Sequence, residues 1–456
     1  MGVRTVAGMT TVLLATLGGG GGPVRVSGPS PFARCTAGGA SLVGSEVEPS
    51  LAVDRKRPRR IVAAYQQDRN EGAGARGIVA ATSVDGGRTW HRKTLPVSLC
   101  AGHGSPFATD PWVSIGAGGR AYVAALGRGI SVVTSGDGGR NWTKPVEISG
   151  PNFADKESIT ADPTRPGVAY LVWSDYLPTN PPGTESDELL SITRDGGRTW
   201  SRPRPILLHG DQAGPLSSQI LVDARTGRLY DLVSWVQGGY ATPGSPAQFF
   251  VVHSDDGGAT WTKAQELGIG RPASGRRGPV IRTSPAVPSF AIDDAGTLYA
   301  AWQDARFSAG RAEQIVFTRS RDGGATWAAP RRVEGADVAT ILPAIAAGGN
   351  GCVAILYLQL GSPDVLRGAR YRTVVSTDGG RTFTGGSLGT SFDLSRAPRI
   401  KGDVLVPSGY FVGDYLGLAP LGGSRFGAAF VVTTAARSNP TVLLYAAFGS
   451  GLSAHA

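Results

Sequence analysis

Acidic side chains stand beside arginines or a tyrosine at several points of the 456-residue chain. The residues that could act together are Glu48, Asp68, Arg69, Asp110, Glu157, Asp304, Arg306, Asp414 and Tyr415. Carboxyl groups transfer protons, and arginines hold polar or anionic substrate groups through paired hydrogen bonds. Hydrolysis of a glycosidic bond uses this combination. The alternative is that these residues form ordinary salt bridges and turn caps.

Other kinds of chemistry have little support in the sequence. The five histidines are dispersed, and neither a His-Glu-x-x-His motif nor a Cys-x-x-Cys pair occurs. Nothing resembles a phosphate-binding glycine loop or a Gly-x-Ser-x-Gly nucleophile turn. We therefore expect no cofactor and assign no metal ligands, while a Ca²⁺ ion among the carboxylates is left open.

A repeated sequence pattern predicts the strands and turns that must position these residues. The pattern Ser/Thr-x-Asp-Gly-Gly-x-Thr/Asn-aromatic occurs six times. Its aspartates, 52 to 66 residues apart, are Asp85, Asp137, Asp195, Asp256, Asp322 and Asp378. Oxygens of the Asp and Ser/Thr side chains can bond nearby backbone N–H groups, the glycines supply positive φ, and the aromatic ring can anchor the turn. Each copy predicts a tight turn between two strands.

The segments around each turn read as short strands, and no linker divides the chain. First strands of comparable units begin near Glu48, Asp110, Glu157, Ser218, Ser289, Pro343 and Asp414. We predict an all-β fold: a single β-propeller over residues 35–450, built of four-stranded antiparallel blades. Seven blades fit better than six, provided that a segment near Cys35 to Val43 supplies the missing fourth strand of the last blade.

The repeated turn resembles the Asp box of the sialidase superfamily, also called the BNR repeat. Segments such as Asp110-Pro111-Trp112 and Gly413-Asp414-Tyr415 are similar to those of bacterial secreted sialidase-like propellers. The resemblance implies a propeller fold and places a nucleophilic tyrosine at Tyr415. That family also has an Arg-Ile-Pro motif on its first strand, where this chain has Glu48-Pro49-Ser50. A carboxylate there would repel the acidic group of a sialic acid.

Strand order places the predicted site on one face of the ring. In a meander, the loops alternate between the two ends of the blade, so the aspartate turns lie opposite the starts of the first strands. We assign Tyr415 as nucleophile, Glu157 or Asp414 as its base and Asp68 as acid/base, with Arg69 and Arg306 as substrate clamps. Glu48, Asp110 and Asp304 complete the substrate-binding rim. A packed, buried hydroxyl is the alternative for Tyr415.

The N-terminal residues 1–28 are interpreted as a signal peptide or a disordered export segment, so we expect a secreted, extracellular protein. No later run reaches the roughly 18 apolar residues of a membrane helix. Cys35 and Cys100 could form a disulfide bond, whereas Cys352 lies beside an apolar run and is expected to be a buried thiol.

Charge does not point to a nucleic-acid partner. The formal charge is +10, but the cations are scattered and only six are lysine. We expect a monomer whose partner is a glycan. Two functions follow: an exo-acting glycoside hydrolase of the sialidase type, or a non-catalytic propeller that binds glycans or proteins on the same face.

Overall fold

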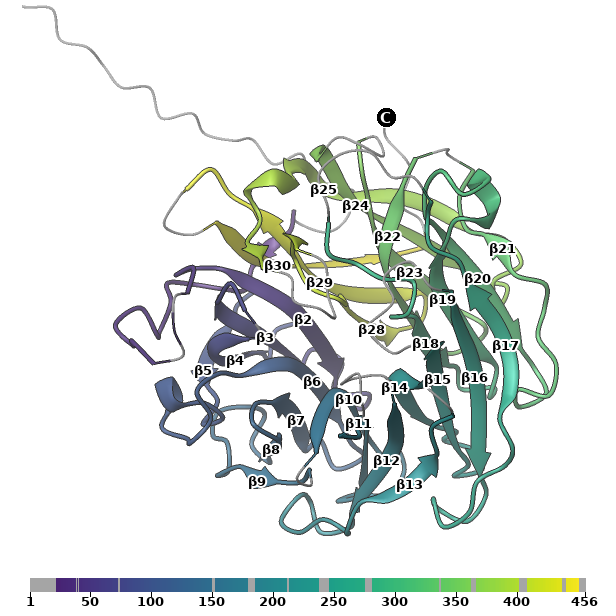
Figure 1. Cartoon of the computed structure of the whole chain (residues 1–456), viewed down its shortest axis with the longest axis horizontal. Coiled ribbons are helices and arrows are strands. Elements are labelled where there is room, and N and C mark those ends of the chain that lie inside the picture. The colour runs from purple at the N-terminus through teal and green to yellow at the C-terminus, as the bar shows by residue number, and fades with distance from the viewer. Residues whose placement is uncertain are drawn as a thin grey trace, which may run out of the picture.

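A computed structural model of the chain describes residues 22–37, 39, 41–72, 74–149, 152–178, 185–210, 213–237, 246–274, 281–335, 338–361, 366–401, 408–436 and 440–450. Seven four-stranded antiparallel sheets are arranged around a common centre (Figure 1). The fold is therefore the predicted all-β propeller, with seven blades rather than six. Most of the expected export segment, residues 1–21, lies outside the described residues.

Blades one to six each run from the inside of the ring to the outside in chain order. Blade one contains β2 (Glu46–Val53), β3 (Ile61–Arg69), β4 (Ala75–Ser83) and β5 (His91–Thr94). Blade two contains β6 (Thr109–Ile115), β7 (Ala121–Leu126), β8 (Ile130–Ser135) and β9 (Val146–Glu147). Blade three contains β10 (Phe153–Ala161), β11 (Ala169–Tyr176), β12 (Ser186–Thr193) and β13 (Arg204–Leu207).

The second half of the ring repeats this design. Blade four contains β14 (Ala213–Val222), β15 (Leu229–Gln237), β16 (Ala247–Ser254) and β17 (Gln265–Gly270). Blade five contains β18 (Ser289–Ile292), β19 (Leu298–Asp304), β20 (Gln314–Ser320) and β21 (Arg331–Arg332). Blade six contains β22 (Thr340–Ala347), β23 (Val353–Gln359), β24 (Arg367–Ser376) and β25 (Thr384–Asp393). A small sheet of β26 (Arg399–Ile400) and β27 (Gly409–Tyr410) precedes blade seven.

Blade seven closes the ring with a strand from the N-terminus. It contains β28 (Gly417–Gly422), β29 (Arg425–Thr433) and β30 (Thr441–Gly449), with β1 (Val24–Arg25) as its outer strand. Val24 pairs with Tyr445, which places the start of the described chain beside its last strand (Figure 1). The prediction that residues 35–43 supply this strand was wrong. Ser41 in that segment instead pairs with Asn70 of blade one.

Small and branched side chains allow neighbouring blades to pack closely. Between blades one and two, Ala64 and Ala80 belong to the same buried cluster as Val113 and Val123. Removing such apolar surface from water is the main driving force for blade association. Among the described residues, none of the helices has the length and apolarity needed to cross a bilayer.

The six predicted turns share one hydrogen-bond pattern. In the third copy, the Thr193 hydroxyl accepts a 2.9 Å bond from the Gly197 amide, and Asp195 Oδ1 accepts a 3.0 Å bond from the Thr199 amide. Equivalent bonds occur in the other five copies. Gly197 has φ +84°, and a β-carbon there would clash with Thr134 of the preceding blade. The repeat is thus a scaffold turn.

A disulfide bond joins Cys35 to Cys100, as the sequence suggested, and Cys352 is a buried free thiol. The bond links the segment between β1 and β2 to the residues that follow blade one. It therefore holds in place the connection between the closing strand β1 of blade seven and the first strand β2 of blade one.

We predict that replacing both bridged cysteines by serine destabilises the propeller. The bond closes a loop of 65 residues, and a crosslink of that span stabilises by about 4 kcal/mol in the chain-entropy model. Denaturant unfolding of the Cys35→Ser/Cys100→Ser variant should show a lower midpoint, and reduced wild-type protein should match it. An unchanged midpoint in both would contradict a stabilising role.

The aspartate turns should also contribute less to the stability of the fold at low pH. Hydrogen bonds from the side chain and backbone of Thr199 lower the pKa of Asp195 to about 2. Because this pKa is lower than in the unfolded chain, the stabilisation is complete above about pH 4 and is lost as the pH falls towards 2. We expect Asp195→Asn to lower the unfolding temperature at pH 6, with a smaller difference from wild type at pH 2. Calorimetry that gave equal differences at both pH values would refute this.

Candidate functional site

The first strands of five blades have a bulge near their start. At four of these bulges one non-glycine residue has a positive φ: Glu48 (53°), Asp110 (47°), Lys156 (53°) and Leu342 (55°). Each is followed by proline, except Lys156, which is followed by Glu157. Backbone strain of about 1–3 kcal/mol per residue persists only where the surroundings enforce it, and it concentrates at functional sites.

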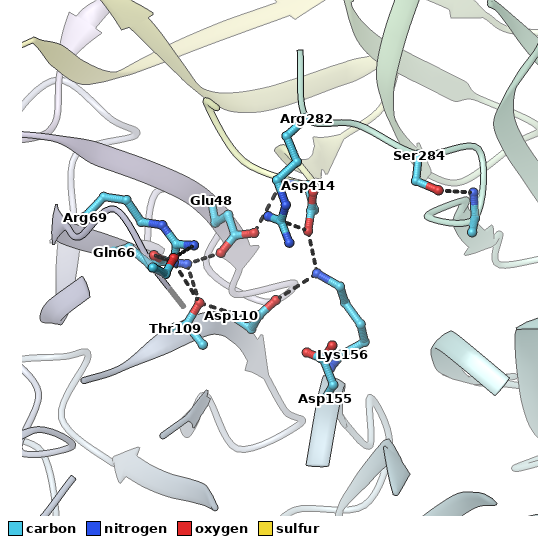
Figure 2. Close-up of polar contacts among 12 residues, drawn as sticks. Glu48, Gln66, Arg69, Thr109, Asp110, Asp155, Lys156, Arg282, Ser284 and Asp414 are labelled. Atoms are coloured by element: carbon cyan, nitrogen blue, oxygen red, sulfur yellow. Dashed lines mark hydrogen bonds and ion pairs between the residues drawn. The ribbon is translucent and has the colours of Figure 1, made fainter. Parts of the chain in front are cut away.

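Lys156 lies between two aspartates from other blades (Figure 2). Its Nζ is 3.2 Å from Asp110 Oδ1 of blade two and 2.6 Å from Asp414 Oδ2, just before β28 of blade seven. Arg282, in the connection between blades four and five, approaches the same Asp414 oxygen at 3.4 Å. The contacts therefore join blades two, three and seven at the centre of the ring.

Burial and charge act against each other in this network. Burial alone would lower the pKa of Lys156, but Asp110 and Asp414 outweigh it and hold that pKa well above its ordinary value. Burial alone would raise the pKa of Asp414, but Arg282 and Lys156 lower it to about 2. At neutral pH the lysine is a cation and Asp414 is an anion, so each charge compensates the other.

Glu48 extends the network towards blade one (Figure 2). Its carboxyl accepts a hydrogen bond from the amide of Gln66 and a 3.3 Å bond from the backbone N–H of Asp414. The Gln66 amide also donates to Thr109 Oγ1 at 2.8 Å. Burial, followed by the neighbouring Asp110, raises the pKa of Glu48 to about 8. Glu48 is thus mostly protonated at neutral pH, which reduces the number of buried charges.

Two arginines flank one aromatic ring beside Glu48. The guanidinium carbons of Arg69 and Arg282 lie 5.1 Å and 4.8 Å from the centre of the Phe411 ring. Arg69 is buried and donates to Gln66, Thr109 and the Gly72 carbonyl. Both terminal nitrogens are therefore committed inside the protein, whereas Nε has no hydrogen-bond partner among the described residues.

Glu157 and Tyr415 line a central cavity of about 310 Å³, which the first strands of all seven blades enclose. The two carboxyl oxygens of Glu157 lack a hydrogen-bond partner among the described residues, and so does the hydroxyl of Tyr415. The Tyr415 ring packs edge-on against Trp112, with ring centres 5.5 Å apart. Burial and nearby carboxyl groups raise the pKa values of both side chains well above their ordinary range.

Asp68 has a different position from the one that an acid/base role requires. Its carboxylate is fully buried and accepts hydrogen bonds from the Gly44 amide at 2.8 Å and the Ser30 hydroxyl at 2.6 Å. Arg76 also pairs with it at 3.6 Å. These contacts hold the N-terminal segment against blade one. The structure gives Asp68 an anchoring role and does not bring it into contact with Glu157 or Tyr415.

Asp304 and Arg306 likewise form a local structure. Arg306 Nε donates to Asp304 Oδ2 at 2.8 Å, and the indole N–H of Trp302 donates to the same oxygen at 3.1 Å. A further bond joins Arg306 to the carbonyl of Ile269. Because these groups satisfy one another at the end of β19, the predicted clamp and rim roles of this pair lose their physical basis.

The structure therefore brings together Glu48, Arg69, Asp110, Glu157, Asp414 and Tyr415 of the predicted set. Sequence reasoning assigned no role to Lys156 or Arg282, although both contact Asp414. Lys156 directly precedes Glu157, which the sequence did single out, and it stands in the charged run Asp155 to Glu157. Arg282 had no such signal, because it lies in a connection without a strand pattern.

Comparisons with known proteins bear on the fold. No protein-family model matches the chain, and no curated protein matches it either. Two structures of an ulvan lyase, a polysaccharide lyase, are 13% identical to it and have TM-scores of 0.52 and 0.53; each match covers 90% of this chain and 95% of the lyase. A Hadza microbial sialidase is 17% identical over 90% of this chain and 66% of its own length, with a TM-score of 0.45.

A further match is the α-L-arabinanase of Penicillium chrysogenum, at 12% identity over 93% of this chain and 97% of the arabinanase, with a TM-score of 0.47. The structural neighbours thus include a sialidase, an arabinanase and a polysaccharide lyase, all at low identity. At such identities, similarity shows the shared propeller fold alone.

Proposed function

We propose that this protein is a secreted glycoside hydrolase whose active site is the central cavity. The observation that carries the proposal is the position of Glu157, a buried carboxyl group that lines the cavity with both oxygens unpartnered. A buried polar group without a partner is costly to maintain, so its presence in a cavity favours a ligand that supplies the missing bonds. Neighbours that act on glycans make this class of substrate the first to test.

Glu157 is suited to act as the general acid. Burial and the nearby Asp110 raise its pKa, which favours the protonated carboxyl, the state that can protonate the oxygen of a leaving sugar. Asp414 is suited to a second role, because its charge can stabilise the positive charge that develops on the sugar ring during bond cleavage. Lys156 would hold that carboxylate in place.

The assignment of Tyr415 changes with this geometry. A nucleophilic tyrosine needs a nearby base, but burial favours the protonated form of Glu157, and Asp414 has a pKa of about 2 and an ion pair with Lys156. We propose that the Tyr415 hydroxyl instead donates a hydrogen bond to the substrate. Nucleophilic attack by Tyr415, as the resemblance implied, would require Glu157 to lose its proton first.

Within this proposal, the six aspartate turns are Asp boxes, but the ligand is not a sialic acid. Glu48 occupies the strand position where the sialidase motif has an arginine, and both terminal nitrogens of Arg69 donate to Gln66, Thr109 and Gly72. A sugar carboxylate bound beside Glu48 would lie close to the Asp414 anion. Neutral glycosides therefore fit the site better than α-sialosides.

We predict that Glu157→Gln lowers the hydrolysis rate of the best substrate in a fluorogenic glycoside panel by about 10²–10⁴-fold, the usual contribution of a general acid. Tyr415→Phe should lower the rate by about tenfold, as expected for one lost hydrogen bond. Glu188→Gln is the matched control, because Glu188 is an equally buried glutamate between blades three and four. Equal losses in the Glu157 and Glu188 variants would remove the catalytic assignment.

The pH profile tests the role of Glu157 separately. The catalytic form is the protonated one, so activity should persist above the ordinary pKa of a glutamate and fall as the pH rises through the raised pKa of this group. A rate that instead increased over the same range would identify Glu157 as a base and restore Tyr415 as nucleophile.

A non-catalytic glycan-binding propeller is the second candidate. The observation that favours it is the ion-pair network of Lys156, which is buried at the centre of the ring next to the cavity. The Glu157 oxygens are themselves buried, so a glycan in the cavity would reach them only after a local rearrangement. No release from any glycoside, together with glycan binding that Trp112→Ala abolishes, would establish this function.

A further inference from the structure

The ends of the blades that carry the aspartate turns concentrate arginine. Four of the six turns have an arginine directly after the two glycines: Arg88, Arg140, Arg198 and Arg381. These turns join the third and fourth strands, so they lie at the opposite end of the blades from Glu48, Asp110 and Lys156. The side chains are exposed. The positive charge that is scattered along the sequence is therefore partly gathered on one face.

Four arginines meet at one place on this face, between blades five and six, and we call them the arginine cluster. Its members are Arg319, Arg321, Arg331 and Arg381. Arg319 donates to the carbonyl of Gly379, and Arg331 donates to the carbonyl of Gly380 and, at 3.2 Å, to that of Arg381. Blade five thus holds its arginines against the turn of blade six.

Two of the guanidinium groups lie close to Gly379. A β-carbon placed on Gly379 would lie 3.2 Å from Arg319 Nη1 and 3.3 Å from Arg321 Nη2. Arg331 is fixed by aromatic rings, with its guanidinium carbon 5.5 Å from the centre of Phe317 and 5.1 Å from that of Phe383. The cluster is consequently preorganised, since two of its members are already held by carbonyl groups and rings.

No acidic side chain pairs with the cluster within the described part of the chain. The aspartates of the two adjoining turns, Asp322 and Asp378, use their oxygens for hydrogen bonds inside their own turns. Burial and then the charges of Arg321, Arg381 and Arg331 lower the pKa of Arg319. Asp378 partly compensates the charge of Arg331, but no acid forms an ion pair with the cluster in the described part of the chain, and an external anion would relieve the repulsion among the arginines.

Other arginines at this end of the blades do pair with an acid. Arg228 pairs with Asp255 at 2.6 Å within blade four, and Arg165 pairs with Asp162 at 2.8 Å in blade three. Arg225 pairs with Asp223 at 3.1 Å. Within the described part of the chain, no such ion pair accompanies the four cations between blades five and six.

We propose that the arginine cluster binds the sulfate or carboxylate groups of an anionic polysaccharide. Arginine forms two parallel hydrogen bonds with such planar or tetrahedral anions, and several arginines at one point can bind successive charged groups of a polymer. The rings at the cluster lie beneath Arg331, so they offer no platform for stacking of nucleic-acid bases. The site is distinct from the central cavity, and its binding of a polymer does not depend on the hydrolase function.

Binding to heparin, a sulfated polysaccharide, tests the proposal by calorimetry or surface-based titration at several salt concentrations. Arg321→Ala/Arg381→Ala removes two exposed cluster members for which no structural role is evident. We expect about tenfold weaker binding at ~0.1 M salt and a shallower dependence of log Kd on log salt, as for the loss of two ionic contacts. Hydrolysis in the central cavity should not change.

Arg128→Ala/Arg202→Ala is the matched control, because both residues are exposed, lie outside the cluster and give the same change in net charge. Equal weakening in the two double variants would show that net charge alone attracts the polymer and would overturn the proposal. Tighter binding of double-stranded DNA than of heparin, with the same loss in the cluster variant, would assign the face to nucleic acid instead. Equal unfolding temperatures for both variants would verify that folding is intact.

Discussion

The ion pairs of Lys156 with Asp110 and Asp414 are the contact on which the centre of the ring depends. Three blades meet there, and each contributes a charge that would be unstable alone at this depth. Removing one partner of a buried ion pair costs about 3–5 kcal/mol, because the remaining charge has no water around it. The strained bulges at Asp110 and Lys156 are tolerated because they aim these side chains at one another.

This arrangement divides the central acids into two kinds. Asp414 has cations beside it and stays ionised, whereas Glu48 and Glu157 lie where burial dominates and hold their protons. A site with one stable anion and one neutral acid can supply both a charge and a proton, which is the division of labour that glycosidic bond cleavage needs. The backbone that forms the ring therefore also determines the chemistry at its centre.

The sequence predicts those features that arise from local chemistry. Each aspartate turn is specified within eight residues, so the blades follow from the repeat, and the starts of the first strands bring Glu48, Asp110, Glu157 and Asp414 together. The closing strand could not be found in this way, because Val24–Arg25 has only two residues and no turn signal. Asp68, Asp304 and Arg306 lie at or just after the ends of second strands, where the N-terminal segment, neighbouring residues and the adjacent blade satisfy them.

The charges at the two ends of the blades arise from both repeated and unrepeated sequence positions. A turn whose aspartate bonds its own backbone leaves the following arginine with no internal acid to pair with, and the repeat multiplies this feature around the ring. Between blades five and six, Arg319 and Arg331 lie outside the repeated pattern and add charge at one point. At the centre, likewise, Lys156 and Arg282 are not repeated from blade to blade. The ring provides equivalent positions, and single departures from the repeat give one of them a specific chemistry.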